Sequence, residues 1–259
     1  MRLHKKIAES GFCSRRAAEK LIGEGLVTVN GKVAEIGQIV SDDDEIVIDG
    51  KPLNSKAEKI YIALNKPAGY TCTNRRFKGE KNIFDLVDID ERLFVVGRLD
   101  KDSRGLVILT NDGDYALKAT HPRYHHEKVY EVTVKPNSPN FNRSPNKSPA
   151  TKISPSAKLS FAFAKEGAKD NEKLWADDIL SCLKKGITSD GEFLVAKKAL
   201  YLGENTFKIT LAEGKKRQLR RMFGYMDLWV TDLLRTQIGK VKLEDLEEGE
   251  WQEIKNPRE

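Results

Sequence analysis

The side chain best placed to do chemistry is Asp100, in the segment GRLDKDSRGLVILTNDG. It follows an apolar run over residues 93–96 and precedes a second one, GLVIL, so the chain must turn between them. An aspartate at the end of a strand can project into a cleft, where its carboxylate is a candidate for catalysis. An aspartate that caps its own turn would leave the same pattern. Turn or cap roles explain the neighbouring polar residues Asp102, Ser103, Asn111 and Asp112.

Metal and nucleotide chemistry have no matching motif in the sequence. Three histidines cluster in HPRYHHE, but they lack the cysteine partners of a zinc site, and we expect a structural or RNA-facing role for them. The three cysteines are far apart and never form a CxxC pair, so neither a disulfide framework nor a structural zinc site is expected. No GxxxxGK[ST] phosphate loop is present. The sequence therefore predicts no metal, nucleotide or redox cofactor.

Positive charge is concentrated in two segments. The formal net charge is only +6, but residues 1–32 hold seven Lys and Arg against three Glu, and residues 213–221, EGKKRQLRR, hold five against one. Localised positive charge suits a polyanion such as RNA. In the first segment Arg15, Arg16 and Lys20 open the polar side of one helix, where they could meet one phosphate backbone. An ordinary solvated helix face would look the same.

The elements around these residues divide the chain into two domains. Residues 1–52 are predicted to form two short helices, the second with Ser14 as N-cap, and two hairpins marked by Asn30-Gly31 and Asp49-Gly50. A linker is expected at 53–58 and a second domain at 59–259. Strands and helices mix irregularly in that domain, so an α+β fold is favoured over a doubly wound sheet.

One stretch follows the pattern of neither domain. Residues 136–156 contain five prolines, five serines and four asparagines, a composition that cannot bury enough apolar area to offset its ordering entropy. We expect this stretch to be mobile and basic, and to belong to an insertion at about 136–190 that adds a helix near 173–184. It could be an extra RNA tether or an extension tolerated at a loop tip.

The sequence is not that of a membrane protein. Its mean hydropathy is −0.53, and no apolar run approaches the roughly eighteen residues of a spanning helix. The start, MRLHKKIAESGF, has neither an apolar stretch nor a cleavage site, so no secretory signal is predicted and a cytoplasmic location is expected. A monomer is the default expectation.

Four blocks in order, LNKPAGY, GRLDKDSRGLVILTNDG, KVYEV and EGKKRQLRRMF, resemble the RsuA/RluB/RluE/RluF family of ribosomal RNA pseudouridine synthases. The segment RLHKKIAESGFCSRRAAEKLIGEGLVTVNGKV resembles the small RNA-binding domain of ribosomal protein S-four type. The resemblance covers nearly all the chain except about 136–190, where this sequence departs from the family. It implies a catalytic domain with a mixed, mainly antiparallel sheet, preceded by a small α+β RNA-binding domain.

By this resemblance Asp100 is the catalytic aspartate, which acts either as a nucleophile or as the base that removes a proton from the sugar. The resemblance also implies that Arg220 is its basic partner and that Tyr130 stacks on the uracil. From the residues alone, Arg220 could equally bind phosphate from a helix face, and Tyr130 could be an ordinary core aromatic. Arg98 resembles the arginine that fills the gap left by a flipped base, although it could pair with a local acid. The residues expected to bind RNA are Arg2, Lys5, Arg15, Arg16, Lys20, Lys32, Arg98, Lys215, Arg217 and Arg221. Those expected to shape the cleft wall are Lys66, Pro67 and Gly69.

The resemblance implies an isomerase that converts a specific uridine of ribosomal RNA to pseudouridine after flipping it out of the RNA, without a cofactor. Its partner would be ribosomal RNA or a ribosome assembly intermediate. One alternative is an assembly factor of the same fold that binds RNA without catalysis. Another is a nucleoside or RNA hydrolase that uses Asp100 and Asp102 as an acid/base pair. The sequence leaves open which uridine and which subunit's RNA is modified.

Overall fold

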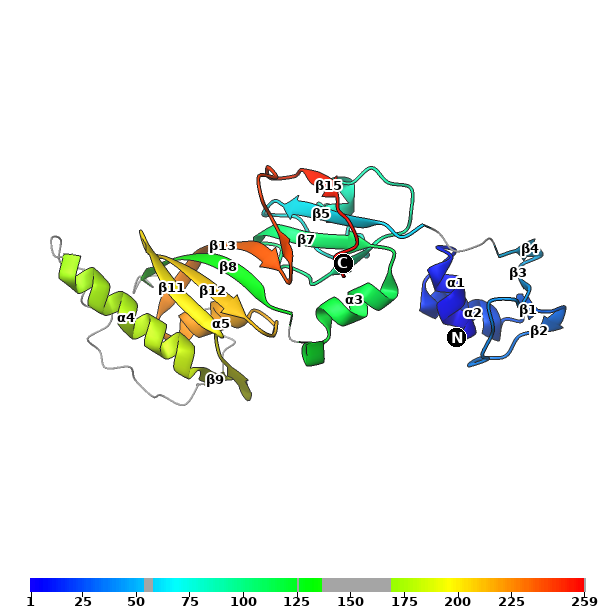
Figure 1. The fold of residues 1–259 in the computed structure, drawn as a ribbon, viewed down its shortest axis with the longest axis horizontal. Helices are drawn as coiled ribbons and strands as arrows, with labels where there is room; N and C mark the ends of the chain where they lie inside the picture. Colours follow the sequence, from blue (N-terminus) through cyan, green and yellow to red (C-terminus); the bar gives the residue numbers. More distant parts are fainter. Residues whose placement is uncertain (54–57, 125, 137–168, 259) are drawn as a thin grey trace.

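The computed structural model describes residues 1–53, 58–124, 126–136 and 169–258 (Figure 1). Their buried apolar residues form separate cores, one between residues 3 and 48 and the others between residues 61 and 243. Residues 54–57 of the expected linker, and residues 137–168 of the expected insertion, lie outside the described residues. The composition-based expectation of a mobile segment at 136–156 therefore stays a prediction.

The first unit packs two helices on a small antiparallel sheet. The helices are α1 (Leu3–Glu9) and α2 (Arg15–Gly23). The sheet has the order β2-β1-β3-β4, with strands β1 (Val27–Val29), β2 (Lys32–Val33), β3 (Ile46–Ile48) and β4 (Lys51–Pro52). The Ser14 hydroxyl accepts a hydrogen bond from Ala17 N at 3.0 Å, which confirms the predicted N-cap. Asn30 and Asp49 have φ values of 50° and 47°, as tight hairpin turns require, and both predicted hairpins are present.

The second unit is built on a nine-stranded sheet. Seven of its strands follow the order β11-β12-β8-β13-β7-β5-β15, and the other two, β14 and β6, pair with β13 and β7. The first strands are β5 (Tyr61–Lys66), β6 (Phe94–Val96), β7 (Arg104–Thr110) and β8 (Lys128–Pro136). The later strands are β11 (Lys198–Gly203), β12 (Thr206–Leu211), β13 (Leu228–Ile238), β14 (Val241–Lys242) and β15 (Trp251–Glu253). Only β13 and β7 pair in parallel among the strands described, so the predicted α+β class with a mainly antiparallel sheet is confirmed.

Helices pack on both faces of this sheet (Figure 1). α4 (Lys169–Lys185) and α5 (Gln218–Tyr225) share a core with one face, and α3 (Gly113–Thr120) shares a core with the other. Short 3-10 turns, η1 (Ile83–Asp85) and η2 (Pro122–Tyr124), connect the elements. Because β5 and β7 are buried on both faces, they appear in the sequence as continuous apolar runs. No helix within the described ranges is long and apolar enough to cross a membrane.

Residues 169–190, which the composition placed in the expected insertion, contribute to the core. The helix predicted near 173–184 is present as α4. Its residues Trp175, Ile179 and Leu183 recur every four positions and are at most 4% exposed. The hairpin of β9 (Ile187–Ser189) and β10 (Glu192–Leu194) follows directly and adds Ile187 to the same cluster. A helical apolar face, rather than overall composition, thus decides the structure of this segment.

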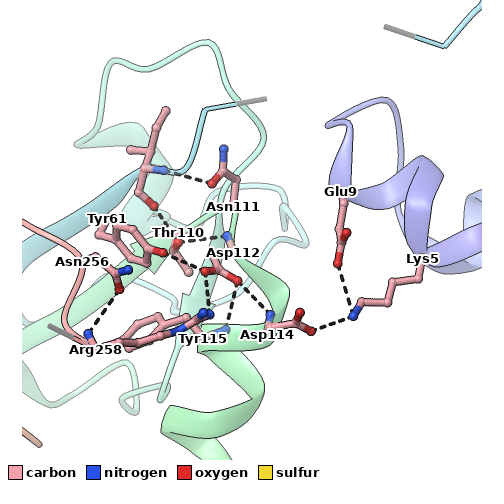
Figure 2. A network of polar contacts seen from close by, with 11 residues as sticks. Lys5, Glu9, Tyr61, Thr110, Asn111, Asp112, Asp114, Tyr115, Asn256 and Arg258 are labelled. Atoms are coloured by element: carbon pink, nitrogen blue, oxygen red, sulfur yellow. Dashed lines mark hydrogen bonds and ion pairs between the residues drawn. The ribbon is translucent and has the colours of Figure 1, made fainter. Parts of the chain in front are cut away.

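The N-terminus of α3 joins three distant parts of the chain (Figure 2). Asp112 is the N-cap, as predicted, and accepts bonds from two backbone N–H groups of the first turn at 3.0 Å. Its carboxylate also accepts a bond from the Tyr61 hydroxyl at 2.7 Å and one from Arg258 Nη2 at 2.6 Å. On the outer side, Asp114 pairs with Lys5 of α1 at 2.8 Å. The first unit, α3 and the C-terminal tail therefore meet in one polar network.

Candidate active site

Asp100 lies on the loop that connects β6 to β7, at the end of an apolar strand as the sequence indicated. Its side chain is 37% exposed, and its carbonyl accepts a hydrogen bond from Ser103 N at 3.1 Å. The adjacent Leu99 is buried in the core that faces α4 and α5. The carboxylate is therefore reachable from solvent while its main chain is fixed by the fold.

Among the described residues, Arg217 is the cation that forms an ion pair with Asp100. Its Nη1 lies 3.5 Å from Asp100 Oδ2 and 3.6 Å from Asp102 Oδ1. Arg217 immediately precedes α5 and has φ 50° and ψ 34°, a left-handed conformation that costs a residue with a Cβ some free energy. From the sequence, Arg217 was expected to bind RNA through its phosphates. In the structure it contacts two carboxylates instead, and so it links the loop that carries Asp100 to the start of α5.

Arg220, the expected partner of Asp100, makes its closest carboxylate contact with Asp102, at 3.1 Å from Oδ2. Its guanidinium also donates to the carbonyls of Asp102 and Val230, at 3.2 and 3.1 Å, and to the Ser103 hydroxyl at 3.3 Å. Burial lowers the pKa of Arg220, and the charges of Asp102 and Asp100 oppose that effect. Its buried Nε has no partner among the described residues. Arg220 thus fixes the segment just after Asp100 and retains one unused donor.

Lys66, from the motif LNKPAGY, is fully buried at the end of β5. Its ammonium donates to three carbonyls, those of Pro67 at 2.9 Å, Lys101 at 3.3 Å and Ser103 at 2.5 Å. Burial lowers the pKa of Lys66 to about 8, with Cys72, Asp102 and Asp100 opposing the shift. A lysine has three donors, and all three are used here. Lys66 therefore holds the chain on the C-terminal side of Asp100.

Arg235 of β13 holds the chain on the other side, and the sequence reasoning did not single it out. It is 1% exposed and donates to the carbonyls of Gly97 at 2.5 Å, Arg98 at 3.4 Å and Leu106 at 2.7 Å. A basic residue inside the apolar strand LWVTDLLRTQI was the available signal, because a buried arginine needs several acceptors. Gly105 makes room for it, since a Cβ there would lie 2.4 Å from the Arg235 carbonyl oxygen.

Tyr130 lies on β8 directly opposite Arg235 of β13. Its ring belongs to the core that also contains Leu99, and the residue is 7% exposed. Its hydroxyl has no hydrogen-bond partner within the part of the chain that the structure describes. Buried tyrosines usually find a partner for this group, so an unbonded hydroxyl on the strand next to Arg235 is available to a ligand.

The basic residues expected to bind RNA lie in two kinds of environment. Lys215 and Arg221 bind the β9–β10 hairpin: Lys215 Nζ donates to the Phe193 carbonyl at 2.6 Å, and Arg221 pairs with Glu192 at 2.5 Å. Lys5 pairs with Asp114, and Arg15 Nη2 lies 3.5 Å from where a Cβ on Gly113 would be. The remaining members are exposed on the surface: Arg2, Arg16, Lys20, Lys32 and Arg98. Of these, Lys20 pairs with Glu24 at 3.5 Å.

The structure therefore brings Asp100, Arg217 and Arg220 together. It places Tyr130 on the neighbouring strand, directly opposite Arg235, which anchors the loop of Asp100. The N-terminal bases lie on a separate unit. An anchored, half-exposed carboxylate beside two guanidinium groups can act as a nucleophile or base toward a polar, anionic substrate. Among the described residues no group of three His, Cys, Asp or Glu side chains could hold a metal ion.

Comparisons with known proteins find matches for both units of the chain. Residues 60–225 match the family model described as RNA pseudouridylate synthase, and residues 1–46 match the S4 domain. The "Dual-specificity RNA pseudouridine synthase RluF" of Salmonella typhi is 37% identical over 256 residues, which cover 98% of this chain and 75% of that protein. The "Ribosomal large subunit pseudouridine synthase B" of Bacillus subtilis is 35% identical, with 98% and 91% covered. A crystal structure of a pseudouridylate synthase superposes with a TM-score of 0.61 at 30% identity, over 100% of this chain and 97% of that one.

Proposed function

The chain belongs to the RNA pseudouridylate synthase family, and we propose on this basis that it isomerises a specific uridine of ribosomal RNA to pseudouridine, with Asp100 as the catalytic residue. The substrate class is supported by the names of two relatives, one an RNA pseudouridine synthase and the other a ribosomal large subunit pseudouridine synthase. The observation that carries the proposal is the environment of Asp100. Its carboxylate is 37% exposed, lies 3.5 Å from the Arg217 guanidinium, and stands on a loop anchored by Lys66 and Arg235.

The reaction needs little beyond such a carboxylate. The bond between C1′ of the ribose and N1 of the uracil breaks, the uracil turns, and a bond from C1′ to C5 forms. The proton on C5 leaves and N1 takes up a proton, so substrate and product are isomers. Asp100 can attack as a nucleophile or remove a proton from the sugar as a base. Both roles need the ionised carboxylate, beside which Arg217 and Arg220 place positive charge.

The substrate base must leave the RNA stack to reach Asp100, because its reacting atoms are inaccessible in a stacked strand. Tyr130 is suited to receive it, since its ring can stack on uracil and its hydroxyl is unbonded within the described residues. The unused Nε of Arg220 is a further donor close to Asp102 and Ser103. Arg98 is exposed two residues before Asp100 and could occupy the space that the flipped base leaves.

The N-terminal unit supplies RNA affinity in this proposal. Arg16 and Lys32 are exposed and have no acidic partner within the described residues, which suits contacts to phosphate. Such contacts are insensitive to base sequence, so the catalytic unit would select the uridine by shape and by unstacked bases. Two expectations remain with this proposal: a monomer and a location in the cytoplasm.

Tritium release tests the proposal directly. Ribosomal RNA transcribed with uridine tritiated at C5 is incubated with the wild-type protein, with Asp100→Asn and with a chelator. The wild type should release tritium to water whether or not the chelator is present. Asp100→Asn should release at least about a hundredfold less and bind the RNA with nearly unchanged affinity. Parallel loss of binding and turnover in Asp100→Asn would argue against a chemical role for this carboxylate.

The same assay separates the alternatives. A protein that binds RNA tightly but releases no tritium, from naked RNA or from assembly intermediates, would be an assembly factor without catalysis. A hydrolase that uses Asp100 and Asp102 would release free uracil, which chromatography separates from the pseudouridine retained in the RNA chain.

A further inference from the structure

Phe77 is an exposed aromatic residue in the loop between β5 and η1. The residue is 53% exposed, and every residue from Asn74 to Lys81 is exposed as well. An exposed aromatic side chain does not gain the free energy that burial of its large apolar surface would give. A phenylalanine at the tip of a polar loop is therefore a candidate for binding a ligand if the loop is ordered and the neighbouring side chains suit that ligand.

The loop is held at its base. Asn82 is 2% exposed, and its amide donates to the carbonyls of Thr73 at 2.8 Å and Arg75 at 3.1 Å. Asn74 Nδ2 donates to the Leu93 carbonyl at 2.8 Å. At the tip, Glu80 N donates to the Phe77 carbonyl at 3.1 Å and closes a turn. The phenylalanine is thus presented on a fixed support, which lowers the entropy cost of binding a ligand.

The loop also adjoins the candidate active site. Gly69 N donates to the carbonyl of Lys101, the residue after Asp100, at 2.7 Å. Lys101 Nζ in turn pairs with Glu80 at 3.1 Å. The loop and the segment of Asp100 are therefore bonded to each other at two points, one of them at Glu80, three residues after Phe77.

Of the four basic residues close to Phe77 in the sequence, two have a partner within the described part of the protein and two do not. Arg76 pairs with Asp85, and Lys81 lies over the Tyr70 ring at 5.4 Å. Arg75 and Lys78 have no acidic partner within the residues that the structure describes. An exposed aromatic between two uncommitted cations matches single-stranded RNA, whose bases stack on aromatic rings while its phosphates bind cations.

We propose that residues 73–81 form a second RNA-contact element, in which Phe77 stacks on an unpaired base next to the target uridine and Arg75 and Lys78 bind adjacent phosphates. This proposal rests on the proposed function, because it takes RNA bound at Asp100 as its starting point. Stacking is tolerant of base identity, so the element would select for an unpaired neighbour rather than for a sequence. A protein partner is less favoured, because one phenylalanine among cations offers little apolar area.

Variants of the exposed residues test the proposal in the full-length protein. Phe77→Ala should weaken binding of ribosomal RNA by roughly five- to a hundredfold, the range for removal of one stacked base. Phe77→Trp should keep the affinity, and Phe77→Leu, which is apolar but not aromatic, should bind nearly as weakly as Phe77→Ala. The matched control is Leu200→Ala, because Leu200 is 60% exposed on β11 and its neighbours Ala199 and Tyr201 are the residues that face the core.

The role of the two cations is tested by the salt dependence of RNA binding. Arg75→Gln with Lys78→Gln should lower the log–log salt slope by roughly 0.7 for each single-strand phosphate that these two side chains bind in the wild type. Lys208→Gln, an exposed base on β12, is the control and should leave the slope unchanged. Wild-type affinity in Phe77→Ala, or equally weakened binding in Phe77→Ala and Leu200→Ala, would overturn the proposal. Failure of the proposed function would appear separately, as absence of tritium release by the wild type while the Phe77 variants still bind RNA differently.

Discussion

Lys66 and Arg235 hold the main chain on the two sides of Asp100. Lys66 Nζ donates to the Lys101 and Ser103 carbonyls at 3.3 and 2.5 Å, and the Arg235 guanidinium donates to the Gly97 carbonyl at 2.5 Å. Both side chains are buried, and they come from strands on either side of β7 in the sheet. Two charged side chains are thus taken out of water mainly to bind backbone carbonyls. Such costly burial is reasonable where a reactive group must be held in one position.

Arg235→Lys should lower kcat by about ten- to a hundredfold and leave KM nearly unchanged, because a displacement of about 1 Å at a reacting group costs that much. The lysine keeps the charge but cannot reach three carbonyls in the planar arrangement of a guanidinium. Single-turnover tritium release, with RNA binding measured in parallel, checks this expectation. If kcat and the RNA affinity both match the wild type, Arg235 does not position Asp100.

The activity should fall as the pH rises through about 8, because burial gives Lys66 a pKa of about 8 and the neutral amine has only two donors for three carbonyls. Lys66→Met should lack this alkaline limb, and its rate should be low at every pH. A pH profile of single-turnover rates that is identical in wild type and Lys66→Met would contradict the expectation.

Stability should change in the opposite direction over the same pH range. The pKa of Lys66 lies below its ordinary value of 10.5, so between about pH 8 and 10.5 the unfolded chain binds more protons than the folded one. This group therefore makes the free energy of unfolding rise with pH in that window, by up to about 3 kcal/mol. Urea unfolding at pH 7 and pH 10 should show this increment in the wild type and not in Lys66→Met.

Deletion of residues 1–52 should weaken RNA binding and flatten its salt dependence. The log–log slope should fall by about 0.7–0.9 for each phosphate contact that the N-terminal unit makes. Binding titrations at several salt concentrations measure the slope, and Arg16→Gln with Lys32→Gln in the full chain should reproduce part of the change. A slope that the deletion leaves unaltered would mean that this unit does not contact the RNA.

The ion pair between Lys5 and Asp114 should couple the two units weakly. A double-mutant cycle of Lys5→Gln and Asp114→Asn should give a coupling energy of about 0.2–1 kcal/mol in urea unfolding, decreasing at high salt, because both side chains are partly exposed. The matched control is the pair Lys20 and Glu24 within α2, at 3.5 Å. A coupling energy of zero would show that the contact does not fix the units relative to each other.

Much of the fold could be predicted because its signals are local. Ser14 caps α2 and Asn30-Gly31 turns a hairpin through contacts within a few residues, so the sequence pattern is sufficient there. The structure of segment 169–190 was harder to predict, because the composition of the expected insertion is dominated by the residues before it. The apolar face of this segment is also stabilised only by packing against a sheet formed by other parts of the chain. The placement of α4 in the core therefore required the structure.

The sequence by itself determined that Asp100 stands at a turn after an apolar strand, and its motifs identified the family to which the chain belongs. Only the tertiary structure decided which cations surround that carboxylate. Arg217 contacts Asp100 directly, Arg220 pairs with Asp102, and the position of Arg235 follows from the register of β13 beside β7 and β8. These contacts join residues far apart in the chain, and sheet register rather than local pattern sets which side chains meet.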